Sequence, residues 1–327
     1  MKFITITLNP SLDKTLVTRY LAVGYHNRSE ETKYLEPAGR GVNIGRALHQ
    51  LECNTHAIIL LGNDATGIAY NALITEESLE ATCIISDGQT RSNTVILDIS
   101  NGTETHITEE GPEVSEMDLR RVMKALKEFV TEGDFVICTG PLPAGSPPDT
   151  YAHLIEIAHQ AGAQAIVATG EPALAEAFEA KPELVALQRI ECEAFFNYPI
   201  RVKEDIISCA RRFRTMGAGQ ALIEMRNAGR AVLATEAGEW EVDLQPFIHG
   251  SSSGVWDAML AGFLAGQAKQ GSLANKSLEL GAAAAAYTAS HVGNEFGSPQ
   301  DIKEHITGVD VTPVDEEPLT PTLRSGS

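Results

Sequence analysis

The chain has 327 residues, of which 43% are hydrophobic, enough for one large α/β domain or such a domain with a small appendage. Its formal net charge of -19 disfavours nucleic acid as a partner, because an acidic surface repels phosphate backbones. No run of about 18 apolar residues predicts a membrane-spanning helix, and five scattered cysteines without a CxxC pair predict a cytoplasmic protein without disulfides or a zinc cluster.

Short apolar runs alternate with amphipathic helical patterns along most of the chain. The sequence predicts strands at residues 3–8, 55–62, 134–140, 164–170, 183–189, 220–226 and 231–235. It predicts helices at residues 41–51, 118–130, 150–162 and 204–217, with a mostly helical last part. Repeated strand–helix–strand units are typical of a mostly parallel sheet with helices on both faces.

Two segments interrupt this alternation. Residues 10–36 alternate weakly and lack a helical pattern, and residues 90–108 are predicted to form a hairpin around Asn101 and Gly102. We expect the two segments to form a small sheet over the mouth of the main domain. The tail at 310–327 is rich in Pro, Thr and acids and is expected to be disordered, so the folded domain should span residues 1–309.

Three polar or glycine-rich stretches lie where strands end or helices begin. Gly39 and Gly41 accompany the start of a predicted helix that carries Asn43 in its first turn. Such a start favours close approach of an anion or hydroxyl, although an ordinary loop-to-helix turn has the same pattern. Asp13 follows the first strand, where its carboxylate could hold ligand hydroxyls or merely cap a turn. The loop TGPLPAGSPPD (139–149) also follows a strand, and it fits either a ligand-binding loop or a stiff connector.

The stretch HGSSSGVWDAMLAGF (249–263) sets small residues before a helix that should begin near Val255. With Gly254 at the turn, the first amides of this helix would suit a phosphoryl group. Asp257 in the first turn could then accept a proton from an attacking hydroxyl. In the alternative interpretation, Asp257 only complements the helix dipole.

A second interpretation of the same stretch is the G-x-S-x-G turn of serine hydrolases, with Ser252 as the nucleophile. The required order of partners can be met by Asp257 or Asp301 together with His291 or His305. This short match lies in a serine-rich run, and no oxyanion-hole motif of the HGGG type accompanies it, so we favour the phosphoryl interpretation.

Together these stretches resemble the ribokinase-like (PfkB) carbohydrate kinases, and within them the 1-phosphofructokinase and tagatose-6-phosphate kinase branch. The resemblance runs from about residue 1 to residue 307 and is carried by TLNPSLDKT, AGRGVNIGRAL, TRSNTVILD, TGPLPAGSP and GVWDAMLAGFLAG. It implies an α/β fold with a small β-sheet lid. It also implies an ATP- and magnesium-dependent kinase that phosphorylates a hydroxyl of a sugar phosphate, and a homodimer formed through the lids.

The resemblance also assigns roles to particular residues. It implies that Asp257 is the catalytic base and that Gly254 opens the anion hole. The implied substrate-binding residues are Asp13, Gly39, Gly41, Asn43 and Arg91, the last of which would hold the substrate's phosphate. The implied nucleotide-binding residues are Gln188, Glu191, Arg226, Gly229 and Trp256, and Glu191 would hold magnesium through water.

The departures from the family pattern concentrate on the nucleotide side. Trp256 replaces the second glycine of GAGD, Gln188 replaces the asparagine of KPNxxE, and Arg226 replaces a glycine of the nucleotide floor. Arg40 replaces the lysine of GGKG. These changes leave a second hypothesis open, a non-catalytic homologue that binds a sugar phosphate or a protein partner. If the kinase interpretation holds, Trp256 should narrow the phosphate pocket, and restoring glycine there should alter nucleotide binding more than stability.

Overall fold

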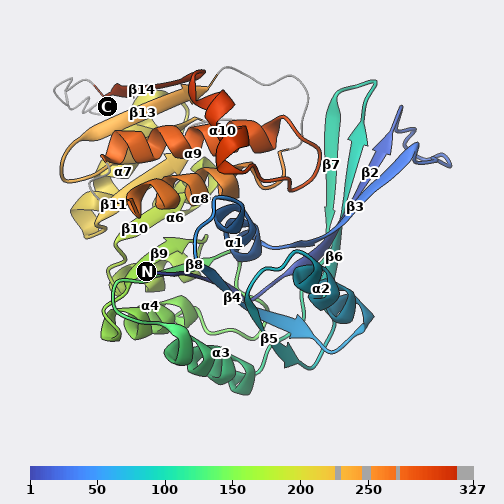
Figure 1. Ribbon diagram of the computed structural model, residues 1–327, viewed down its shortest axis with the longest axis horizontal. Coiled ribbons are helices and arrows are strands. Elements are labelled where there is room, and N and C mark those ends of the chain that lie inside the picture. Colours follow the sequence, from blue (N-terminus) through green and yellow to red (C-terminus); the bar gives the residue numbers. More distant parts are fainter. Residues whose placement is uncertain (225–229, 245–251, 270–272, 315–327) are drawn as a thin grey trace, which may run out of the picture.

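One large sheet carries helices on both of its faces, and a smaller sheet stands beside it (Figure 1). The computed structural model describes residues 1–224, 230–244, 252–269 and 273–314. In spatial order the strands of the large sheet are β14 (Val309–Pro313), β13 (Glu239–Leu244), β12 (Ala231–Ala234), β11 (Gln220–Glu224), β10 (Leu184–Leu187), β9 (Gln164–Ala168), β8 (Phe135–Thr139), β1 (Phe3–Thr7), β4 (Thr55–Gly62) and β5 (Ala81–Ser86). The strands from β11 to β5 pair in parallel, and β12, β13 and β14 pair antiparallel.

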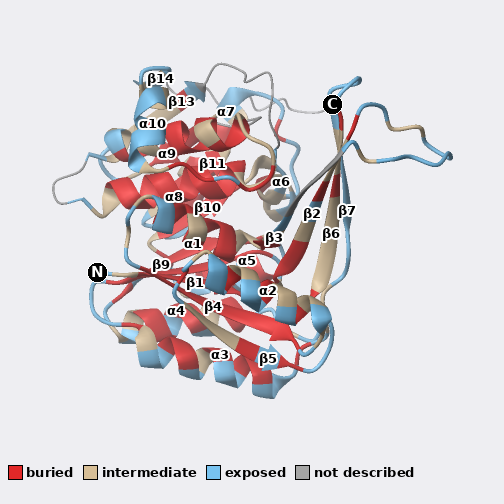
Figure 2. Cartoon of the chain, turned by 45° about the vertical axis from the view of Figure 1, so that its right-hand side comes forward, coloured by how far each residue is buried: buried red, intermediate tan, exposed pale blue. Residues whose placement is uncertain are grey.

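The helices divide into two layers, each with its own hydrophobic core. One face is covered by α1 (Arg40–Gln50), α2 (Ala65–Glu76), α8 (Val255–Gln267), α9 (Ala274–Ala289) and α10 (Pro299–Ile306). The other is covered by α3 (Glu116–Phe129), α4 (Thr150–Gln160), α5 (Ala173–Glu179), α6 (Arg189–Phe196) and α7 (Lys203–Met216). Because both faces are covered, central strands such as β4 are buried at every position (Figure 2), as is usual for parallel sheets. The predicted α/β architecture is confirmed.

The small sheet is the predicted lid. It contains β3 (Glu31–Ala38), β2 (Ser11–Thr18), β6 (Arg91–Asp98) and β7 (Thr103–Thr108), in that order. The hairpin expected around Asn101 and Gly102 joins β6 to β7. The chain enters the lid just after β1 and returns from β3 directly into α1. The lid therefore grows out of the carboxyl edge of the parallel strands, where open α/β sheets bind ligands.

The chain end departs from the sequence-based expectation. Residues 310–313, expected to be disordered, belong to β14, which pairs antiparallel with β13 from Leu244 to Trp240. The prediction was wrong there because backbone hydrogen bonds to an edge strand do not require the apolar side chains on which the sequence pattern depends. Residues 315–327 lie outside the described part of the chain. No helix within the described residues is long and apolar enough to cross a membrane.

Trp256 is part of the core between the sheet and the helices α8 and α9. The residue is 8% exposed and belongs to the same buried cluster as Leu233 and Ala283. Its indole Nε1 has no hydrogen-bond partner among the described residues. This burial argues against the expectation that glycine at position 256 would leave stability unchanged.

We predict that Trp256→Gly lowers the free energy of unfolding by about 3–5 kcal/mol, because a large buried ring is lost, with up to about 1 kcal/mol more from glycine in a helix. Urea denaturation provides the measurement. Trp256→Phe, which keeps most of the ring and removes the unpaired Nε1, should cost much less. A glycine variant with wild-type stability and tighter ATP binding would instead mean that the ring fills a phosphate site.

Candidate active site

Two helix starts meet the carboxyl edge of the parallel strands. Gly39 precedes α1 with φ of 120°, and Gly254 precedes α8 in the left-handed region with φ of 71°. Only glycine adopts such backbone angles without strain. Amide groups at the start of a helix carry partial positive charge, so this edge can receive an anion.

Asp257 occupies the first turn of α8 and is buried, with 6% of the residue exposed. Asn43 of α1 donates a hydrogen bond from Nδ2 to Asp257 Oδ2 at 2.8 Å, and Arg40 Nε lies 3.7 Å from Oδ1. Burial raises the pKa of Asp257, and the Arg40 charge and the Asn43 hydrogen bond oppose that rise without cancelling it. Two predicted site residues, Asp257 and Asn43, are thus in direct contact.

Arg40 lies at the centre of this arrangement. Its Nη1 donates to Glu191 Oε1 at 2.7 Å, so one guanidinium joins Glu191 to Asp257. Burial lowers the pKa of Arg40, but the two carboxylates outweigh that effect and the net shift is upward. Its Nη2 is buried without a hydrogen-bond partner in the described part of the protein. In the sequence, Arg40 stands out from the family pattern only as a replacement for lysine; its position between two glycines at a helix start was the available signal.

Gln188 and Glu191 begin α6, at the end of β10. The Gln188 backbone N–H donates to Glu191 Oε2 at 2.8 Å, which fixes the carboxylate that faces Arg40. Glu224, at the end of the adjacent strand β11, was not predicted as a site residue. Burial and then the Glu191 charge raise the pKa of Glu224 to about 7, with Arg40 opposing. This part of the site is therefore rich in carboxylates around one buried arginine.

The lid contributes a second polar group. Asp13 on β2 lies opposite Asn93 on β6 in the parallel ladder, and Asn93 Nδ2 donates to Asp13 Oδ1 at 2.9 Å. Burial raises the pKa of Asp13, while hydrogen bonds from Ser11 and Asn93 and the Arg91 charge oppose it. The Nε and Nη2 of Arg91 donate to the Asn9 carbonyl oxygen at 3.3 and 3.2 Å. The structure thus brings Asp13, Arg91 and Asn93 together at the base of the lid.

A cavity of about 450 Å³ lies next to Arg40 and Glu191. Its remaining wall is the loop at 141–148, which follows β8, and the turn at 170–173, which follows β9. The Ser146 hydroxyl has no hydrogen-bond partner among the described residues. The Pro- and Gly-rich loop is therefore placed beside the polar cluster, as the ligand-binding interpretation of its sequence requires.

The other residues that the resemblance assigns to the site are Gly41, Arg226 and Gly229. Gly41 is buried against β1, and a Cβ there would lie 2.4 Å from Thr7 Oγ1 and 2.6 Å from the Ile6 carbonyl oxygen. Helix packing alone accounts for this glycine, and its contact with substrate stays a prediction. Arg226 and Gly229 lie outside the described residues.

The hydrolase interpretation gains no support from the geometry. Asp257 is held by Asn43 and Arg40. Asp301 caps the start of α10 through Ser298, and His291 Nδ1 lies 2.8 Å from the Tyr287 carbonyl oxygen. These candidate partners of Ser252 are engaged elsewhere.

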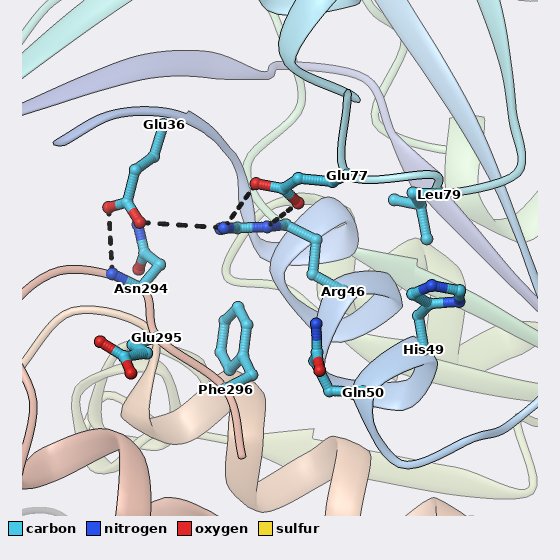
Figure 3. Close-up of a pocket in the computed structure, with 9 residues that line it drawn as sticks. All are labelled: Glu36, Arg46, His49, Gln50, Glu77, Leu79, Asn294, Glu295 and Phe296. Atoms are coloured by element: carbon cyan, nitrogen blue, oxygen red, sulfur yellow. Dashed lines mark hydrogen bonds and ion pairs between the residues drawn. The ribbon is translucent and has the colours of Figure 1, made fainter. Parts of the chain in front are cut away.

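A further network joins the base of the lid to the large domain (Figure 3). Arg46 of α1 donates from Nε and Nη2 to the Glu77 carboxylate at 2.6 and 2.8 Å, and its Nη2 lies 3.8 Å from Glu36 Oε1. Glu36, on lid strand β3, accepts a hydrogen bond from the Asn294 backbone N–H at 3.1 Å. The Asn294 side chain packs against Gly254, because a Cβ on that glycine would lie only 2.8 Å from Asn294 Oδ1. The network therefore connects the lid to the start of α8.

The sequence pattern of the pfkB family carbohydrate kinases matches residues 7–301. The 1-phosphofructokinase of Bacillus subtilis is 30% identical over 309 residues, which cover 94% of this chain and 98% of that protein. The D-tagatose-1-phosphate kinase of Bacillus licheniformis is 27% identical over 315 residues, covering 94% of this chain and 98% of its own.

Solved structures share the fold. A possible 1-phosphofructokinase from Thermotoga maritima superposes with a TM-score of 0.86 at 22% identity, covering 96% of this chain and 100% of that one. Phosphofructokinase-2 from Escherichia coli, in complex with substrates and products, gives a TM-score of 0.86 at 24% identity, covering 94% of this chain and 99% of that one. The match of the family pattern to most of the sequence shows that the chain belongs to the pfkB family of carbohydrate kinases.

Proposed function

We propose that this protein transfers the γ-phosphoryl group of ATP to a hydroxyl of a phosphorylated ketohexose, with Asp257 as the general base. One observation carries the proposal: a buried carboxylate at the start of α8 is oriented by Asn43 and Arg40. The family and the names of the relatives support a phosphorylated sugar as the acceptor.

In the proposed step, Asp257 accepts the proton of the sugar hydroxyl while that oxygen forms a bond to the γ-phosphorus. The bond from the γ-phosphorus to the bridging oxygen breaks, and ADP leaves with the electron pair. Arg40 stabilises the ionised Asp257 and offers to the transferring group its Nη2, which has no hydrogen-bond partner among the described residues. The intact, oriented Asp257 favours catalysis over the alternative of a non-catalytic homologue.

Magnesium would neutralise charge on the phosphates of ATP. Glu191 is the proposed protein group for it, acting through water, because Arg40 and the Gln188 amide already bind its carboxylate oxygens. The described residues contain no group of three or more His, Cys, Asp or Glu side chains that could hold a metal. This fits a cation held mainly by water and substrate phosphates, as is usual for magnesium at phosphoryl-transfer sites.

The lid carries the proposed dimer contacts and, together with α1, the proposed substrate contacts. Asp13 and Asn43 would hold sugar hydroxyls, and Arg91 would bind the phosphate already on the substrate. Exposed apolar side chains on the lid include Tyr20, Leu35, Ile99 and Ile107. A small open sheet with such residues is marginal by itself, and a second copy of the lid would cover it. The cysteines are all free thiols, which fits the expected cytoplasmic location.

The first prediction concerns the base. Asp257→Asn keeps the shape of the side chain and the hydrogen bond from Asn43 but cannot accept the proton. We expect kcat to fall by about 10²–10⁴-fold in a coupled assay of ADP release across sugar phosphates. Asp301→Asn, which also changes a first-turn acid, is the control and should retain activity. Equal turnover by Asp257→Asn and wild type would contradict the assignment.

A second prediction concerns Glu224 and pH. Because folding raises its pKa from 4.5 to about 7, the folded state favours the protonated carboxyl. The stability that this group contributes is present below about pH 4.5 and is lost as pH rises through about 7. The melting temperature of Glu224→Gln, minus that of wild type, should therefore grow between about pH 5 and pH 8. Glu116→Gln, at an exposed site, is the control; a constant difference for Glu224→Gln would contradict the prediction.

A third prediction concerns assembly. Light scattering at micromolar concentration should give the mass of a dimer. Ile99→Asp, which places a charge on the exposed lid surface, should shift that mass toward the monomer. A wild-type monomer would show that the lids do not pair.

A further inference from the structure

One acidic residue of the lid reaches across to the turn before α8. We call residues 252–254 the α8 turn. The Ser252 backbone N–H donates to Glu104 Oε2 at 2.9 Å, and the Ser253 hydroxyl lies 3.5 Å from Glu104 Oε1. Glu104 comes from β7, one of the two edge strands of the lid, which stands beside the large domain (Figure 1). This contact joins lid and large domain in a direct hydrogen bond.

Glu104 differs from the rest of its strand. The other residues of β7 are exposed, whereas Glu104 is covered and its side chain is 17% exposed. His106, two residues along on the same face, places Nε2 3.0 Å from Glu104 Oε1. The carboxylate is therefore held from both sides, by a lid histidine and by the α8 turn.

The α8 turn is a place where an anion is expected. It leads through the left-handed Gly254 into a helix of 13 residues with Asp257 in its first turn. The amides at such a helix start carry partial positive charge. In this structure the negative group bound at the turn is a carboxylate of the protein itself.

We propose that Glu104 latches the lid to the α8 turn and competes there with the phosphates of the phosphoryl donor. Two anions at one turn repel each other, so binding of the donor would release Glu104 and free the lid edge. The competition rests on the proposed kinase function; the latch does not, because it rests on the hydrogen bond from Ser252 to Glu104.

The test uses the full-length protein and Glu104→Ala, with Glu104→Gln as a second variant that keeps the size of the side chain. Glu109→Ala is the matched control, because Glu109 Oε2 also accepts a backbone N–H at 2.9 Å, but from Ser92 inside the lid. Hydrogen exchange of residues 103–108 and 252–257 is measured without ligand. Calorimetry then measures binding of a non-hydrolysable ATP analogue.

We expect faster hydrogen exchange in both segments of Glu104→Ala, and an affinity for the analogue that is at least about fivefold higher than that of wild type. Glu109→Ala should behave like wild type in both measurements. Glu104→Gln should fall between wild type and Glu104→Ala, since it keeps an acceptor oxygen but loses the charge. Unchanged exchange in Glu104→Ala would overturn the latch. Faster exchange with equal or weaker binding would overturn the competition. If the analogue binds to none of the proteins, the proposed function and the competition both fail, and exchange alone decides the latch.

Discussion

The site depends on one buried cation placed between two carboxylates. Arg40 binds Glu191 at 2.7 Å and Asp257 at 3.7 Å, and all three side chains are largely removed from water. A buried charge is costly unless it is paired, so each of these groups requires the others. Because they come from the starts of α1, α6 and α8, the same contacts fix three helix starts at the carboxyl edge of the sheet. Burial alone would favour a protonated Asp257, and the guanidinium opposes that tendency.

The lid is tied to this arrangement at two places. At its base, Glu36 binds the Asn294 amide, and Asn294 packs behind Gly254. At its edge strand β7, Glu104 binds the Ser252 amide. The first contact reaches the start of α8 through Asn294 and the second reaches it directly through Ser252, so a movement of the lid must alter the surroundings of the helix that carries Asp257. The residues proposed to bind the sugar and those proposed to bind the nucleotide are thereby linked through one short turn.

Much of the fold follows from local sequence patterns. Apolar runs such as residues 55–62 and the helical spacing of 41–51 predicted β4 and α1 within one residue. Short elements such as α5 and α6 carry too few turns for a clear period, and they were not predicted. The strand β14 lies in a polar stretch whose pairing with β13 comes from the backbone, which composition does not reveal.

The site was predictable only where a motif marks it. Asp257, Asn43 and Asp13 stand in recognisable stretches, and the structure places each in a polar cluster. Arg40 and Glu191 are 151 residues apart in sequence, and Glu104 and Ser252 are 148 apart. Such contacts depend on the packing of the whole sheet, and one sequence carries no local signal for them. Trp256 was interpreted from its place in a motif, whereas its burial in the core depends on neighbours from other elements.

The most direct test of this account is the stability of two Arg40 variants at neutral pH. Arg40→Met keeps much of the side-chain volume but leaves the Glu191 and Asp257 carboxylates buried without their cation, and Arg40→Lys keeps the charge. We expect chemical denaturation to show a loss of about 3–5 kcal/mol for Arg40→Met and a clearly smaller loss for Arg40→Lys. An Arg40→Met protein as stable as wild type would show that the arginine does not hold these acids together, and would contradict the account.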